Sequence, residues 1–189
     1  DGDVIGTAET GTGKTAAFLL PIIQKICANY RPATMTVLVL APTRELATQI
    51  EAECRKFSPK GVTCACLIGG TSYGKQTQAL KRGVNILIAT PGRLIDFMEQ
   101  GMVNFKNLNT LVLDEADRML DMGFLPAIKR IVKACPEQRQ TLFFSATMAG
   151  EIEHIARQIV KDPTYVEASK RGKAAVTIRR PGLFERAIE

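Results

Sequence analysis

The sequence contains no tryptophan, and aromatic residues make up only 6% of it. This argues against a platform on which the bases of a single strand stack, because such a platform needs several aromatic rings. Long apolar runs are also missing, since no stretch approaches the roughly 18 residues that a membrane helix requires. The first residues, DGDVIG, have neither the basic flank nor the apolar stretch of a signal peptide. We therefore expect a soluble, cytoplasmic protein that does not associate with membranes.

Soft metal ligands are scarce. His154 is the single histidine, and it lies in EIEHIARQIV, a segment with helical spacing that favours a structural or surface role. A structural zinc site needs four close ligands, which an odd and scattered set of cysteines does not offer. Buried free thiols in a reducing compartment are the expected state of the five cysteines, Cys27, Cys54, Cys64, Cys66 and Cys135.

The net charge of +6 suggests a polyanionic partner, but its distribution weakens that inference. The last twenty residues contribute +4 of it, so the body of the chain carries little excess charge. Charge alone does not separate a solvated basic tail from a binding site. At 189 residues the chain fits one domain. It starts at Asp1, without Met, close to an apparent strand, and we expect it to be part of a longer gene product.

Short runs rich in Val, Ile and Leu alternate with longer segments of helical periodicity. This pattern predicts an α/β fold with a mostly parallel sheet and crossover helices on both faces. The predicted strands are 4–7, 35–41, 62–68, 85–89, 110–113, 140–145 and 164–167. The predicted helices are 14–27, 44–57, 72–81, 92–100, 125–134 and 150–160. In such sheets ligands bind beyond the carboxyl ends of the strands, where most of the motifs below fall.

The segment AETGTGKT, residues 8–15, separates the first strand from an apolar helix. Its glycines allow backbone N–H groups to turn around phosphate oxygens, and the following helix adds its positive dipole end. This is a Walker A loop in which Ala8 stands where the general pattern has a glycine. Lys14 is expected at the β and γ phosphates and Thr15 on Mg²⁺. The nucleotide-binding residues are therefore Ala8, Thr10, Gly11, Thr12, Gly13, Lys14 and Thr15.

The segment LVLDEAD, residues 111–117, ends an apolar run with three acids in four positions. Clustered carboxylates repel one another and are costly to desolvate, so a cation is expected among them. In phosphate-loop NTPases a carboxylate at the end of a neighbouring strand holds the magnesium ion, which assigns Asp114 to the metal. Glu115 is then placed to orient and deprotonate a water aimed at the γ-phosphate. The predicted catalytic residues are Lys14, Asp114 and Glu115.

Together with AETGTGKT, the tetrapeptide Asp114-Glu115-Ala116-Asp117 makes the chain resemble the DEAD-box RNA helicases. Further blocks match the family in the same order: PTRELA from residue 42, Gly69-Gly70, TPGR from residue 90, and SAT from residue 145. The resemblance covers residues 1–168. It implies an N-terminal RecA-like domain of a phosphate-loop NTPase, with ATP and Mg²⁺ as cofactors.

The resemblance also implies an RNA partner, which is bound through its sugar-phosphate backbone without regard to base identity. The residues that it assigns to RNA are Pro42, Thr43, Arg44, Gly69, Gly70, Thr90, Pro91, Gly92 and Arg93. Ser145 and Thr147 are implied as a coupling element whose hydroxyls bond Asp117. The block DRMLDMGF, from residue 117, has the Met and Leu spacing of a packed helix.

Two parts of the family pattern are missing from this sequence. The upstream glutamine motif that recognises adenine is absent from the sequence. The expectation that the nucleotide is ATP rather than GTP therefore rests on the family resemblance alone. The second RecA-like domain, which supplies an arginine finger and half of the RNA clamp, is absent as well. Residues 169–189 read as a basic linker or tail, and IRRPGLFERAIE does not fit the family pattern. We expect an isolated monomeric domain that hydrolyses ATP poorly and does not unwind duplexes.

Two rival hypotheses stay open at this stage. The chain could be a phosphate-loop ATPase of another substrate class, such as a DNA translocase, and RNA-selective stimulation would discriminate. It could also be a non-enzymatic module that uses the fold to bind RNA or protein. The intact Lys14, Thr15, Asp114 and Glu115 argue against a degenerate copy.

Overall fold

Runs of Val, Ile and Leu form the centre of a single sheet. The strands VLVL, ILIA and TLVL are buried at every position, which is typical of strands covered on both faces. The computed structural model describes residues 2–8, 11–148, 150–168 and 176–179. Its strands are β1 (Val4–Thr7), β2 (Val37–Leu40), β3 (Cys64–Leu67), β4 (Ile86–Ala89), β5 (Thr110–Leu113), β6 (Gln140–Ser145), β7 (Thr164–Ala168) and β8 (Val176–Arg179).

The strand order is β3-β4-β2-β5-β6-β1-β7-β8. Every pairing is parallel except that of β7 with β8, which is antiparallel. The predicted, mostly parallel α/β sheet is thereby confirmed. The strand β8 was not predicted, and it falls within the segment that the sequence analysis assigned to a linker or tail.

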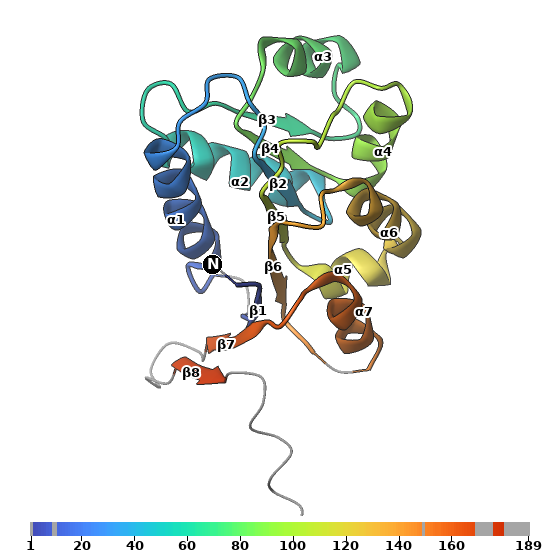
Figure 1. Cartoon of the computed structure of the whole chain (residues 1–189). Helices are drawn as coiled ribbons and strands as arrows, with labels where there is room; N and C mark the ends of the chain where they lie inside the picture. The colour runs from blue at the N-terminus through green and yellow to red at the C-terminus, as the bar shows by residue number, and fades with distance from the viewer. Residues whose placement is uncertain (1, 9–10, 149, 169–175, 180–189) are drawn as a thin grey trace, which may run out of the picture.

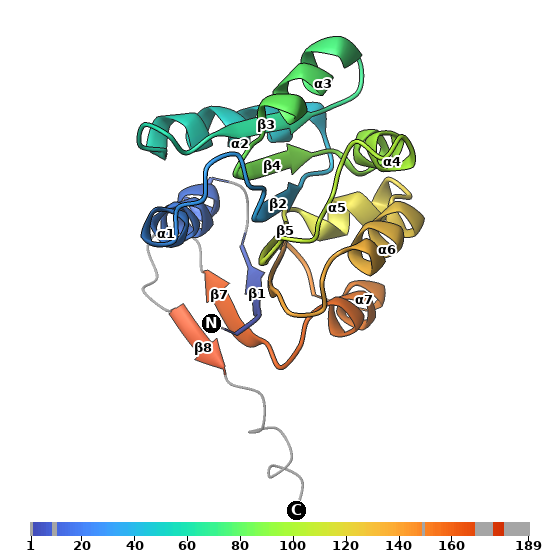
Figure 2. The same ribbon diagram turned by 45° about the horizontal axis from the view of Figure 1, so that its top comes forward.

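Helices cover both faces of the sheet (Figures 1 and 2). On one face lie α1 and α2, whose apolar residues share a cluster with alternate positions of β2 and β4. On the other face lie α4 to α7, packed around a second cluster that includes Phe97 and Phe143. The helices are α1 (Lys14–Ala28), α2 (Arg44–Phe57), α3 (Tyr73–Arg82), α4 (Pro91–Glu99), α5 (Ala116–Asp121), α6 (Leu125–Ala134) and α7 (Glu151–Ile159).

The predicted element bounds differ from the observed ones by two residues at most. β2 and β3 are shorter at both ends than their apolar runs, because the flanking residues have no regular secondary structure. The block after the acidic tetrapeptide forms the short helix α5, as its Met and Leu spacing indicated. All five cysteines are free, but Cys27 is exposed and Cys66 is only partly buried. No helix in the described part of the chain is long and apolar enough to cross a membrane.

The strand order places the loops that carry the sequence motifs at one edge of the sheet. β1 and β5 both pair with β6, so the loops that follow them flank the end of β6. On the other side of β5, Leu40 of β2 and Leu67 of β3 are both in register with Ala89 of β4. The segments after these three strands therefore leave the sheet side by side, at its carboxyl edge.

Candidate active site

The loop after β1 is shaped by glycines in left-handed conformation. Gly11 has φ of 80° and Gly13 has φ of 83°, and a Cβ atom at either position would meet no other atom within 4 Å. Backbone conformation rather than space is therefore what requires glycine there. The amide of Ala8 donates to the carbonyl of Ser145 at 3.1 Å, which ties the start of the loop to β6. Thr10 lies outside the described residues.

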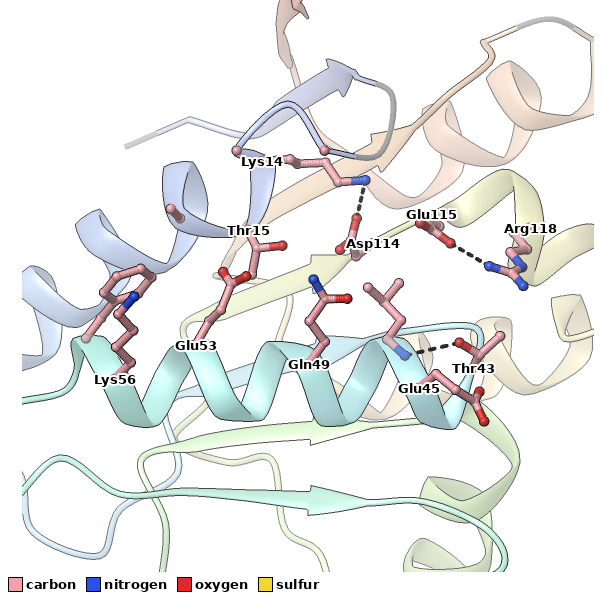
Figure 3. A pocket seen from close by; sticks show the side chains of 15 residues that line it. Lys14, Thr15, Thr43, Glu45, Gln49, Glu53, Lys56, Asp114, Glu115 and Arg118 are labelled. Atoms are coloured by element: carbon pink, nitrogen blue, oxygen red, sulfur yellow. Dashed lines mark hydrogen bonds and ion pairs between the residues drawn. The ribbon is translucent and has the colours of Figure 1, made fainter.

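Lys14, the first residue of α1, meets Asp114, the residue that follows β5 (Figure 3). Nζ of Lys14 lies 2.6 Å from Oδ1 of Asp114, and the exposed fractions of the two side chains are 8% and 1%. Oδ2 of Asp114 has no hydrogen-bond partner among the described residues. Burial raises the pKa of the Asp114 carboxyl, and the Lys14 ammonium group opposes that rise.

Glu115 follows in a conformation that is rare for a residue with a side chain. Its φ and ψ are 52° and 53°, in the left-handed region, and it caps the short helix α5. Oε2 lies 3.3 Å from Nη1 of Arg118, one turn along the helix. A left-handed backbone conformation at a non-glycine residue costs about 1–2 kcal/mol. Residues in this conformation cluster at functional sites. The Glu115 side chain lines the cleft described below, and Figure 3 shows its carboxylate directed toward Arg118.

A cleft of about 730 Å³ opens between these loops and α2. It is lined by Gly11, Gly13, Lys14, Thr15, Ala16, Thr43, Glu45, Leu46, Gln49, Glu53, Lys56, Phe57, Asp114, Glu115 and Arg118. Acids and cations both face the cleft, so a phosphate ester and a metal ion together would match its charges better than either alone.

The residues present fit a magnesium site rather than a closed protein cage. In the described ranges, no group of three or more His, Cys, Asp or Glu side chains is arranged to hold a metal ion alone. Magnesium usually keeps several waters and binds one or two carboxylates together with substrate phosphates. Asp114 offers a buried carboxylate oxygen without a partner, and the Thr15 hydroxyl lines the same cleft.

Asp117 connects α5 to the loop after β6. Its Oδ2 accepts hydrogen bonds from the backbone amides of Ala146 and Thr147, at 3.1 and 3.2 Å, and from the Thr147 hydroxyl at 3.5 Å. The hydroxyl of Ser145 instead donates to the carbonyl of Thr147, at 2.6 Å. The expected link to Asp117 is therefore made by Thr147 and two amides, whereas Ser145 shapes the loop.

At the edge formed by β2, β3 and β4, Arg44 lies against the glycine doublet. Its Nη1 donates to the carbonyl of Gly69 at 3.4 Å, and a Cβ atom on Gly70 would overlap the same nitrogen. The Thr43 hydroxyl accepts from the amide of Leu46 and caps α2, while Thr43 also lines the cleft described above. Pro42 is buried, so its part is to shape the turn.

The TPGR segment begins α4 at the end of β4. Thr90 is the N-cap and Pro91 is the first helical residue, and both are buried. Gly92 is exposed, and the guanidinium carbon of Arg93 lies 5.4 Å from the centroid of the Tyr73 ring. Tyr73 in turn stacks on Phe97, with ring centroids 4.2 Å apart. The structure thus brings exposed backbone and the guanidinium groups of Arg44 and Arg93 to the edge where β2, β3 and β4 end.

A model of the DEAD/DEAH box helicase family matches residues 1–155. The chain belongs to this family. It is 53% identical over 165 residues to DEAD-box ATP-dependent RNA helicase 30 of Arabidopsis thaliana, covering 85% of this chain and 28% of that protein. It is 49% identical over 170 residues to DEAD-box ATP-dependent RNA helicase CshA of Streptococcus pneumoniae, covering 89% of this chain and 32% of that one.

Solved DEAD-box structures have the same fold. A DEAD box protein from the hyperthermophile Methanococcus jannaschii superposes with a TM-score of 0.81 at 35% identity, over 89% of this chain and 46% of that one. The yeast DEAD-box splicing factor Prp28 gives a TM-score of 0.82 at 38% identity, over 91% and 43% of the two chains. The chain corresponds to the N-terminal DEAD domain, and it spans 16% to 33% of the length of the curated relatives that it matches.

Several residues of this DEAD domain site were missed by the sequence analysis. Gln49 and Glu53 of α2 line the cleft, Arg118 pairs with Glu115, and the guanidinium group of Arg93 lies over the Tyr73 ring. The helical spacing of 49 and 53 was visible in the sequence, but nothing local indicated that α2 faces the phosphate loop. Arg118 is three residues from Glu115, which is the spacing of helical ion pairs.

Proposed function

We propose that this chain binds Mg-ATP and the backbone of one RNA strand, as the first of two domains of an ATP-dependent RNA helicase. The observation that carries the proposal is the buried Lys14–Asp114 pair, which joins the start of α1 to the end of β5 and leaves one carboxylate oxygen without a partner among the described residues. A purely structural pair of this kind is weak evidence for stability, because desolvation of both charges offsets their attraction. A role in ligand binding would explain why two charged groups are buried at this place.

Nucleotide binding would exchange this pair for contacts with the ligand. Lys14 would turn to phosphate oxygens, together with the amides of the loop and the first turn of α1. Thr15 and Asp114 would hold the magnesium ion. The ion would neutralise charge on the phosphates. The exchange compensates both buried charges at once, so neither is left alone in the low-dielectric interior.

Hydrolysis would use Glu115, which has a left-handed backbone conformation and lines the cleft. Its carboxylate would orient a water and accept its proton. An arginine finger supplied in trans contributes roughly 10³ to 10⁵ in rate to phosphate-loop enzymes. We therefore assign efficient turnover and unwinding to the protein with both domains, and nucleotide binding to this one.

RNA would lie along the edge where β2, β3 and β4 end. Arg44 and Arg93 present guanidinium groups there, and Gly70 and Gly92 expose backbone to solvent. Contacts of this kind position a phosphate chain without reading bases. Asp117 and the loop of Thr147 would connect this edge to the nucleotide cleft through the hydrogen bonds of Oδ2.

The decisive test is a nucleotide titration of this chain by calorimetry, with ATP, ADP and GTP, in Mg²⁺ and in EDTA. We expect magnesium-dependent binding of ATP and ADP to the parent and none to Lys14→Ala. Glu115→Gln should bind as the parent does. Equal affinity of the parent and Lys14→Ala would reject the proposed cleft.

The RNA assignment needs a separate measurement. In a protein that includes the second domain, single-stranded RNA should stimulate ATP hydrolysis more than DNA of the same sequence. Arg44→Ala and Arg93→Ala should reduce that stimulation and leave nucleotide affinity unchanged. Equal stimulation by DNA would favour a translocase, and absence of turnover in the presence of RNA would favour a binding module.

A further inference from the structure

The face of α2 that borders the nucleotide cleft carries two polar side chains one helical turn apart. Gln49 and Glu53 both line the cleft. Figure 3 shows both side chains rising from α2, with Glu53 directed toward Thr15 and Gln49 toward Asp114. Among the described residues, neither side chain has a hydrogen-bond or ion-pair partner. They are thus uncommitted polar groups that face the two residues assigned to the metal.

A carboxylate beside a loop that would bind phosphate is electrostatically unfavourable unless a cation compensates it. Glu53 would repel a bound triphosphate unless a cation lay between them, because like charges a few ångströms apart disfavour one another. Lys56, on the same helix, has its Nζ 6.0 Å from the centroid of the Phe57 ring and forms no ion pair with Glu53. The charge of Glu53 is therefore not balanced by its own helix in this structure.

Magnesium supplies such a cation, and it brings water. The ion demands octahedral coordination and gives up its waters reluctantly. The chain offers few direct ligands, the Thr15 hydroxyl and the buried Asp114 carboxylate, so several positions would be filled by waters and phosphates. Metal-bound waters donate hydrogen bonds. They need acceptors, and outer-shell acceptors of this kind orient a metal site.

We propose that Gln49 and Glu53 are positioning residues that accept hydrogen bonds from the waters of the magnesium ion bound with nucleotide. This inference rests on the proposed function, since it requires that Mg-nucleotide enters the cleft. It adds a role for α2, which also begins with Thr43 and Arg44 at the RNA edge. The same helix would then border both ligand sites.

The test measures nucleotide affinity of this chain as a function of free Mg²⁺. The free Mg²⁺ concentration that gives half of the maximal increase in nucleotide affinity is the quantity compared. We expect Glu53→Ala to raise this concentration about tenfold, which is the lower end of the range of metal-affinity losses seen when an outer-shell partner is removed. Gln49→Ala should shift it in the same direction. Affinity for ADP in EDTA should not fall in either variant, because neither side chain is proposed to contact the nucleotide itself.

Two control variants separate a specific role from a general change of charge. Glu51→Gln removes a negative charge from the same helix, at a residue that pairs with Arg55 instead of lining the cleft. It should leave the Mg²⁺ dependence unchanged. Glu53→Gln keeps an acceptor oxygen and should shift the dependence less than Glu53→Ala.

The outcomes distinguish this inference from the proposed function. Magnesium-independent binding, or no binding, by the parent would reject the proposed function itself. Normal magnesium dependence in the parent, unchanged in Glu53→Ala and Gln49→Ala, would overturn the outer-shell role alone. An equal loss of affinity with and without Mg²⁺ in these variants would overturn it too, because it would indicate a direct nucleotide contact or a structural defect.

Discussion

Nζ of Lys14 lies 2.6 Å from Oδ1 of Asp114, where the first turn of α1 meets the end of β5. The contact crosses the end of β6, the strand that separates β1 from β5 in the sheet. It holds the phosphate loop and the acidic tetrapeptide together before any ligand arrives. Since both side chains are buried, each depends on the other for compensation of its charge.

Lys14→Met should therefore destabilise the fold in a pH-dependent way. Removing one partner of a buried pair costs about 3–5 kcal/mol when the other charge stays uncompensated. Burial already raises the pKa of Asp114 above its ordinary value of 3.8, and the loss of Lys14 removes the main opposing influence. Between pH 3.8 and the raised pKa, Asp114 is protonated in the folded variant and ionised in the unfolded chain. The free energy of unfolding of the variant therefore falls as the pH rises from about 3.8 through the raised pKa.

Urea denaturation at pH 5 and pH 8 checks this prediction. The deficit of Lys14→Met relative to the parent should be smaller at pH 5 than at pH 8, because the raised pKa of Asp114 favours uptake of a proton at the lower pH. The double variant Lys14→Met/Asp114→Asn has no carboxyl to titrate, so its deficit should be similar at both pH values. A deficit of Lys14→Met that does not change with pH would contradict the account.

Glu115 should be a site where catalysis and stability conflict. At φ of 52° a side chain is strained and glycine is not, so Glu115→Gly should be more stable than Glu115→Ala by about 1 kcal/mol. Both variants lose the ion pair with Arg118, so the comparison isolates the backbone. Thermal unfolding measures the difference, at about 2–4 °C per kcal/mol for a domain of this size. Equal melting temperatures would show that the left-handed turn is not strained.

The parts of this fold that were predictable from sequence are those fixed by local patterns. The buried runs of β2, β4 and β5 and the glycine loop before Lys14 carry their own signals, in apolar composition and in the sequence G-T-G-K-T. The short strand β8 lacked one, because four residues in a basic, Gly- and Pro-containing tail give little periodicity. Its pairing with β7 depends on a neighbour that the local sequence does not reveal.

The parts of the site that were missed depend on packing between distant segments. Glu53 reads as an ordinary surface residue of α2 until that helix is placed beside the phosphate loop. Ser145 was assigned to Asp117, but the backbone of the loop directs its hydroxyl to the Thr147 carbonyl. Tyr73 gave no signal, because its contact with Arg93 joins the start of α3 to the start of α4.

Gly70→Ala should disturb the position of Arg44. At φ of 71° the substitution strains the backbone by about 1 kcal/mol, and the new methyl group occupies the place of Nη1 of Arg44. The matched control is Gly101→Ala, at φ of 66°, where a Cβ atom meets nothing within 4 Å. Both variants should lose similar stability in urea, but only Gly70→Ala should weaken RNA binding in the two-domain protein. Equal RNA affinities would remove Arg44 from the proposed RNA edge.

Asp117→Ala should loosen the loop after β6 without weakening the proposed binding of nucleotide. Oδ2 of Asp117 accepts from the amides of Ala146 and Thr147, and both residues are exposed, so water can replace the carboxylate at a cost of about 1 kcal/mol. Hydrogen exchange of these two amides should accelerate, while Mg-nucleotide affinity stays at the parent value.

Thr147→Val is the matched control for this loop, because it removes only the 3.5 Å hydroxyl contact and keeps both amide bonds. Its exchange rates should stay close to those of the parent. If Asp117 transmits RNA binding to the nucleotide cleft, Asp117→Ala in the two-domain protein should lose RNA stimulation of hydrolysis far more than Thr147→Val does. Equal losses in the two variants would assign the coupling to the hydroxyl and not to the amides that Asp117 holds, since only the hydroxyl contact is missing from both.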